Sequence, residues 1–95
     1  MFSRPSNCLF RLYVSARSAS SLRAIDTVRL LVRADDVFEV IDVAEHPERA
    51  EADRVLATPM LLKLEPLPRQ RVIGDLLDLG RLRQALGLEQ RESAA

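Results

Sequence analysis

Apolar and polar side chains alternate along residues 8–14, and the apolar set is Phe10, Leu12 and Val14. Alternation over a short stretch places one set of side chains on each face of a β-strand. Residues 8–14 are therefore predicted to form the first strand. The polar segment 15–20 follows and ends the alternation.

The spacing of apolar residues then lengthens to about three or four, which is the period of an amphipathic helix. Ser18 or Ser20 suits the N-cap position of this helix, since a serine hydroxyl can accept a hydrogen bond from a free N–H of the first turn. The helix is expected to end near Ala34. Its apolar positions are Leu22, Ile25, Val28, Leu30, Leu31 and Val32.

A second strand is predicted over residues 37–43, whose apolar side chains indicate a largely buried position. Together with the preceding strand and helix it forms a βαβ unit with parallel strands and a right-handed crossover. Residues 47–56 carry few apolar side chains and several acids. They predict a short exposed helix with Pro47 in its first turn.

Two further strands are predicted in the next segment. Pro59 lies directly before the third strand, residues 60–64, where a missing N–H costs no ladder hydrogen bond. Pro66 and Pro68 force a turn after it. Residues 70–74 then form a fourth strand, antiparallel to the third.

Asp75 is expected to open a final helix that Gly87 ends, with an apolar stripe made of Leu76, Leu79, Leu82 and Leu86. The order βαβαββα describes an α/β fold with a mixed four-stranded sheet and flanking helices. A single domain is predicted over residues 8–88, with flexible segments at 1–7 and 89–95.

Composition narrows the classes of function. The chain has 14 basic and 14 acidic residues, and this balance argues against a nucleic-acid binder. Cys8 is the only cysteine, so the chain has no internal disulfide and no CxxC redox pair, which fits a reducing compartment. No apolar run reaches the roughly 18 residues of a membrane span, and no export signal is visible. We expect a soluble, cytoplasmic protein.

Candidate catalytic and metal-binding residues are few. His46 is the only histidine and has no second ligand at metal-binding spacing, so a solvated loop position is favoured. Cys8, at the start of a central strand, is expected to be a small buried apolar side chain. Glycine-rich phosphate loops and the nucleophile elbow of hydrolases are missing from the sequence. We therefore expect no catalytic residue, no cofactor and no metal.

Six short strings of sequence resemble the KaiB family, in the family's order and spacing. The resemblance extends over about residues 9–88. The strings are Leu12-Tyr13-Val14, Ser21-Leu22-Arg23-Ala24, Val40-Ile41-Asp42-Val43, Pro47 with Ala50-Glu51, Leu56-Ala57-Thr58-Pro59 and Ile73-Gly74-Asp75-Leu76.

This resemblance implies a thioredoxin-like fold, in which the peptide bond before Pro59 is commonly cis. KaiB proteins are clock components that bind the KaiC ATPase ring and switch between a thioredoxin-like fold and a tetrameric fold. The N-terminal sensor domain of the kinase SasA is similar, competes for the same ring and keeps the thioredoxin-like fold. The basic residues that match ring-contacting or neighbouring basic positions of the family are Arg23, Arg54, Lys63 and Arg71.

The chain departs from the family in its charges and prolines. Asp26 and Glu39 occupy places where the family often has lysine, and like charges there would oppose binding to the usual partner. The family's run of three prolines is reduced to Pro66 and Pro68, as in the sensor-domain version. The expected partner is still a KaiC-type ATPase or another signalling protein.

The last helix departs from the family in a way that affects the fold. Ala85-Leu86-Gly87 stands where KaiB has a glycine followed by Leu-Asp. Alanine stabilises a helix interior by roughly 0.5–1 kcal/mol relative to glycine, and two folds of one sequence can differ by only a few kcal/mol. We therefore expect a chain held in the thioredoxin-like state and monomeric, with a tetramer only if the other fold is populated.

Two other functions fit a domain of this kind. A KaiB-like module could serve stress or kinase signalling with a different protein partner. A thioredoxin-like oxidoreductase is disfavoured because CxxC is missing. Residue patterns alone leave open the partner, any role in rhythmicity, the oligomeric state and the isomer at Pro59.

Overall fold

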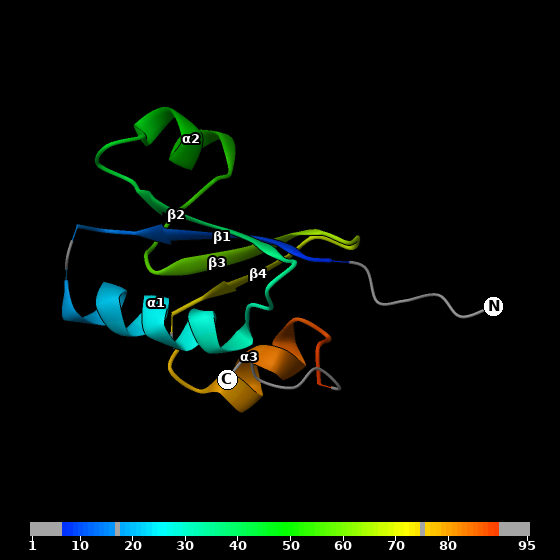
Figure 1. Ribbon diagram of the computed structural model, residues 1–95. Coiled ribbons are helices and arrows are strands. Elements are labelled where there is room, and N and C mark those ends of the chain that lie inside the picture. Colours follow the sequence, from blue (N-terminus) through cyan, green and yellow to red (C-terminus); the bar gives the residue numbers. More distant parts are fainter. Residues whose placement is uncertain (1–6, 17, 75, 90–95) are drawn as a thin grey trace.

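A computed structural model describes residues 7–16, 18–74 and 76–89 of the chain. Its elements follow the predicted order βαβαββα (Figure 1). They are β1 (Leu9–Val14), α1 (Ala19–Leu31), β2 (Val37–Asp42), α2 (Pro47–Ala52), β3 (Met60–Glu65), β4 (Gln70–Ile73) and α3 (Leu79–Ala85). The flexible ends predicted at 1–7 and 89–95 lie almost entirely outside the described residues.

The four strands form one mixed sheet, as predicted, and their order in it is β2-β1-β3-β4. β1 and β2 are parallel because α1 carries the chain back across the sheet between them. β3 runs antiparallel to both β1 and β4. Its pairing with β4 is antiparallel because only a short turn joins the two strands. Within that region the bonds before Pro59, Pro66 and Pro68 are cis.

Two apolar layers pack on opposite faces of the sheet, because side chains alternate along the central strands. α1 and α3 lie together on one side of the sheet and α2 lies on the other (Figure 1). The layer under α1 and α3 includes Phe10, Leu12, Val28, Leu31, Leu61 and Leu82. The layer under α2 is formed by Tyr13, Ile41, Ala50, Met60, Leu62 and Leu64.

The predicted start of α1 is confirmed, because the Ser18 side chain accepts a hydrogen bond from the backbone N–H of Ser21. Its end is three residues earlier than Ala34. Asp36 explains this, since its carboxylate accepts from the backbone N–H groups of Arg33 and Cys8, both at 2.8 Å, and fixes a turn there. The buried face of α1 is Ser21, Ala24, Val28 and Leu31, whereas Leu22 and Leu30 of the predicted stripe are exposed.

The prediction that the second strand is largely buried is wrong. β2 is an edge strand with one neighbour, and Ile41 is its only buried residue. Val37 and Val40 are 56% and 41% exposed. A short apolar run looks the same in a central strand and in an edge strand, so the sequence could not distinguish them.

The final helix begins at Leu79, four residues after the predicted start, and Asp75 lies outside the described residues. Asp78 is its N-cap and accepts from the Arg81 N–H at 3.1 Å. Leu76 is buried in the segment before the helix. Gly87 ends the helix as predicted: it has a φ of 69°, and the Leu88 N–H returns to the Arg83 carbonyl.

Candidate partner-binding face

The C-terminus of α2 presents a strained arginine to solvent. Backbone N–H groups of Arg54 and Val55 donate to the carbonyls of Glu51 and Ala50, at 3.0 and 2.9 Å. This hydrogen-bond pattern requires a left-handed residue just after the helix, a position that glycine usually takes. Arg54 takes it here with a φ of 55°, and its side chain is exposed.

Arg71 reaches this helix end from β4. Its guanidinium donates to the carbonyls of Asp53 and Arg54, at 3.1 and 3.2 Å. A cation at a helix C-terminus is favourable because the carbonyls there carry partial negative charge. The contact brings Arg54 and Arg71, which are 17 positions apart, to one surface.

A network of charged side chains anchors α2 to the sheet. Arg11 of β1 pairs with Glu39 at 3.0 Å and with Asp53 at 2.9 Å. Arg49 of α2 pairs with the same glutamate at 3.1 Å. The Tyr13 hydroxyl donates to the Asp53 carboxylate and lies 3.0 Å from the Arg49 carbonyl. The network therefore links β1, β2 and α2, including the C-terminal end of α2 at Asp53.

The network shifts the pKa values of its members. Burial, together with the hydrogen bond to Asp53, raises the pKa of Tyr13 to about 12. Burial alone would raise the pKa of Asp53, but hydrogen bonds from Tyr13 and Arg11 outweigh it and leave that pKa below its usual value. The pKa of Glu39 is lowered in the same way, by hydrogen bonds from Arg11 and Arg49 that outweigh burial.

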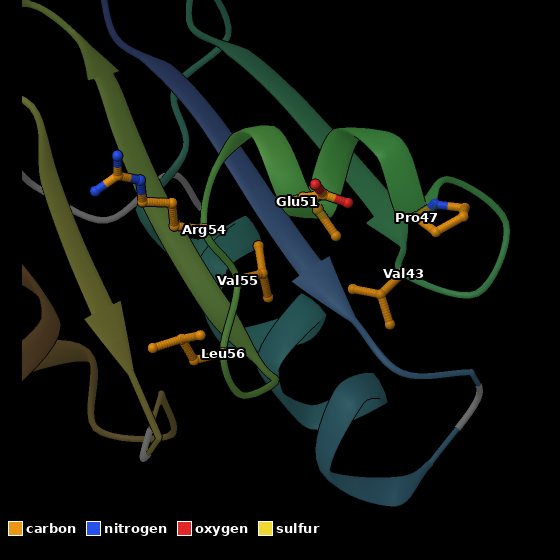
Figure 2. A pocket seen from close by; sticks show the side chains of 7 residues that line it. Val43, Pro47, Glu51, Arg54, Val55 and Leu56 are labelled. Atoms are coloured by element: carbon orange, nitrogen blue, oxygen red, sulfur yellow. The ribbon is translucent and has the colours of Figure 1, made fainter.

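Beside α2 lies a shallow hollow of about 530 Å³, lined by Val43, Pro47, Ala50, Glu51, Arg54, Val55 and Leu56. Figure 2 shows Val43 and Val55 facing its interior, with the charged ends of Glu51 and Arg54 pointing apart. Leu56 is 90% exposed, and Ile73 of β4 is 45% exposed. We call the surface formed by Val43, Glu51, Arg54, Val55, Leu56, Arg71 and Ile73 the α2 face.

A family model for the KaiB domain matches residues 11–88. The chain belongs to the KaiB family. Among its relatives, the circadian clock oscillator protein KaiB of Prochlorococcus marinus strain MIT 9313 is 42% identical over 85 residues, which is 85% of this chain and 70% of the relative. KaiB of Synechococcus elongatus is 40% identical over 74 residues, covering 74% of this chain and 72% of the relative.

The solution structure of the N-terminal domain of Synechococcus elongatus SasA is similar in fold. It superposes with a TM-score of 0.64 at 29% identity, and the match covers 100% of this chain and 95% of that one. The thioredoxin-like architecture implied by the KaiB resemblance is therefore confirmed.

The four basic positions that resemble KaiB contacts have different surroundings. Arg54 and Arg71 share the α2 face. Arg23 is exposed on α1, on the other side of the sheet, where it borders a smaller hollow with Pro59 and Gly74. The fold therefore does not bring Arg23 into the α2 face.

Lys63 differs most from expectation, because it is only 3% exposed. Its ammonium donates to the carbonyls of Pro66 and, at 3.0 Å, Pro68. Lys63 therefore fixes the turn between β3 and β4, and in this conformation it is not a surface contact for a KaiB partner.

Two features of the site lay outside the sequence analysis. Residues 40 positions apart form the hydrogen bond between Tyr13 and Asp53, which no local pattern indicates. The hollow had one signal, since Val55 and Leu56 are large apolar residues that follow a segment with few of them.

Proposed function

We propose that this KaiB-family chain is a non-catalytic, cytoplasmic adapter of a clock system that binds a KaiC-type ATPase ring through the α2 face. The observation that carries the proposal is the placement of Arg54 and Arg71 beside the exposed Leu56. The names of the relatives, which are circadian clock oscillator proteins, support the clock setting.

The composition of the α2 face suits a protein partner. Arginine and apolar side chains are enriched at the anchoring positions of interfaces, and a charged rim guides association. Glu39 does not oppose an acidic partner as strongly as its position in the sequence suggested. Its carboxylate is paired with Arg11 and Arg49, so its charge is compensated within the chain.

We also propose that the chain is held in the thioredoxin-like state. Residues 79–85 are helical, with Ala85 as the last residue of α3 and Gly87 in the left-handed conformation that follows. The substitution Ala85→Gly restores the residue that KaiB proteins carry here, and it should weaken α3 by less than the roughly 1 kcal/mol of a helix interior, because Ala85 is the last residue of the helix. NMR of the wild-type chain should show α3 as the only conformation of the C-terminal segment. A strand in place of this helix would contradict the proposal.

A second function is favoured by the similarity to SasA over the whole chain. The domain could act in a kinase-linked pathway and bind a partner other than the ring. Co-purification with such a partner, together with no binding to the ring, would support this alternative.

The test is native mass spectrometry of the chain mixed with a KaiC-type hexamer from the same genome. Arg54→Glu should weaken binding, most strongly at low salt, because it reverses a charge on the α2 face. Arg29→Glu is the matched control, since it makes the same charge change at an exposed position of α1. Arg23→Glu tests separately whether the α1 side takes part.

Two outcomes would contradict ring binding through this face. The first is a folded chain that does not bind the hexamer at any concentration tested. The second is binding that Arg54→Glu and Arg29→Glu weaken equally, because this would indicate a general charge effect.

A further inference from the structure

The smaller hollow beside α1 has a volume of about 160 Å³, and we call it the α1 hollow. Its lining residues include Arg23, Ala24, Pro59, Gly74, Leu76 and Leu77. They come from α1, from the position just before β3 and from the segment between β4 and α3 (Figure 1). Three of the strings that resemble KaiB therefore meet at a place that the α2 face does not include.

The walls of the α1 hollow are mostly apolar. Ala24 and Leu76 are each only 1% exposed, so they belong to the buried part of the hollow, whereas Leu77 is 52% exposed. A Cβ added at Gly74 would meet nothing within 4 Å, so the space beside this residue is open. An apolar group can therefore enter from solvent and contact buried apolar surface.

The size of the α1 hollow restricts what it can hold. Pockets for small molecules and cofactors have volumes of roughly 300–1,000 Å³, and this one has about 160 Å³. It suits a single aliphatic side chain and not a cofactor. Extended peptides bind by placing individual side chains in pockets of this kind, which favours a segment of another protein as the occupant.

The charge beside the α1 hollow indicates the second feature of that segment. Arg23 is the one charged side chain among the described residues that line the hollow, and it is exposed. None of the ion pairs within the described ranges includes it. Its guanidinium can receive a carboxylate through two parallel hydrogen bonds, and the nearby N-terminus of α1 adds partial positive charge.

We propose that the α1 hollow binds an extended segment of a partner protein in which an aliphatic side chain lies two positions from an aspartate or glutamate. Side chains two positions apart point to the same side of an extended chain. The aliphatic side chain then packs against Ala24 and Leu76 while the carboxylate pairs with Arg23. One side chain and one exposed ion pair give a weak complex. This site does not depend on ring binding, because it lies outside the α2 face.

The experiment is an NMR titration of the ¹⁵N-labelled chain, without any ring. The probes are two end-capped peptides that cover both chain directions, Gly-Ser-Val-Ser-Asp-Ser-Gly and Gly-Ser-Asp-Ser-Val-Ser-Gly. At least one should cause saturable shifts centred on the amides of Ser20, Ala24 and Gly74. Replacing its valine by glycine, or its aspartate by lysine, should weaken binding by about three- to tenfold at low salt.

Variants of the chain test each contact separately. Arg23→Glu should reverse the charge preference, so that the lysine peptide binds better than the aspartate peptide. Arg29→Glu, at an exposed position of the same helix, is the matched control and should keep the preference for aspartate. Leu77→Ser should weaken binding of both peptides, whereas Leu22→Ser, at a leucine that is 49% exposed, should not. Circular dichroism confirms that each variant is folded.

Three results would overturn the peptide site. They are the lack of saturable shifts with either probe, binding that the change of valine to glycine leaves unaltered, and shifts centred on Val43 and Val55 of the α2 face. An equal effect of Arg23→Glu and Arg29→Glu would also contradict a pairing of the carboxylate with Arg23. Failure of ring binding with intact peptide binding would overturn only the proposed function.

Discussion

The hydroxyl of Tyr13 and the carboxylate of Asp53 are hydrogen-bonded across 40 positions of sequence, which ties β1 to the C-terminus of α2. Tyr13 is fully buried, and Asp53 is also paired with Arg11. The α2 face rests on this contact, because Asp53 directly precedes Arg54. Stability of the network and placement of the face are therefore linked.

Tyr13→Phe should destabilise the fold by about 1–3 kcal/mol at neutral pH, because the Asp53 carboxylate loses the hydrogen bond that the hydroxyl donates. The measurement is urea unfolding of both proteins. An unchanged midpoint would show that the hydroxyl contributes nothing to the network.

The same tyrosine makes stability depend on alkaline pH. Its pKa is raised to about 12 in the fold, against about 10 in the unfolded chain. The protonated form is therefore favoured by folding, and this contribution is present below about pH 10 and lost as pH rises toward 12. Because Tyr13 is the only tyrosine, ultraviolet titration reports its ionisation directly. Tyr13→Phe should lose less stability over this range than wild type.

Acidic pH should also destabilise the network, through its carboxylates. The pKa values of Asp53 and Glu39 are lowered in the fold, so their contribution is complete above the unfolded values of about 3.9 and 4.3. It is lost as pH falls through the lower folded values. Asp53→Asn should be less stable than wild type at neutral pH and less sensitive to acid. Glu45→Gln, at an exposed turn position, is the control for stability at neutral pH and should leave it unchanged.

The strand and helix order could be predicted because it follows from local patterns. The alternation along β1 places Phe10 and Tyr13 on opposite faces of the sheet, and both are buried as two covered faces require. Ser18 as an N-cap and Gly87 as a helix end depend only on nearby backbone groups. These features need no knowledge of distant contacts.

The remaining features depend on tertiary contacts. Val37 and Val40 are exposed because β2 has no outer neighbour, which is a property of strand order and not of the strand itself. Lys63 is buried because a turn brings two carbonyls over it. Of the predicted contacts, Arg54 and Arg71 were brought together by α2 packing on the sheet, whereas Arg23 was placed on the other side.

Arg54→Gly should stabilise the chain by about 0.5–1 kcal/mol, because glycine adopts a φ of 55° without the steric cost of a Cβ. Arg54→Ala is the matched control: it removes the same guanidinium but keeps the Cβ, so it should give no gain. Thermal unfolding of the three proteins measures the difference. Equal stability of the glycine and alanine variants would show that the backbone at this position stores no strain. A stabilised Arg54→Gly that binds its partner less well would mean that the arginine is retained for binding and not for folding.

Gly87→Ala should have the opposite effect to Arg54→Gly. Space is available for a Cβ at Gly87, with nothing within 4 Å, so the penalty comes only from its φ of 69°. A cost of about 1 kcal/mol is expected, together with fraying of the last turn of α3. Hydrogen exchange of the Leu88 amide, which donates to the Arg83 carbonyl, measures that fraying directly. Unchanged exchange would show that the helix end does not depend on glycine.

Lys63 gives the sharpest distinction between a structural and a binding role. Lys63→Met keeps the length and apolar stem of the side chain but removes the donor to the Pro66 and Pro68 carbonyls. Pro66 is half-buried and Pro68 is exposed, so water can replace the donor to Pro68 more easily than the donor to Pro66, and we expect a loss of about 1 kcal/mol in stability. If Lys63 were instead a surface contact, the substitution would leave unfolding unchanged and weaken only partner binding. Urea unfolding and a binding measurement with the ring separate the two roles. The structural role predicts a lower unfolding midpoint, whereas the binding role predicts an unchanged midpoint and weaker binding.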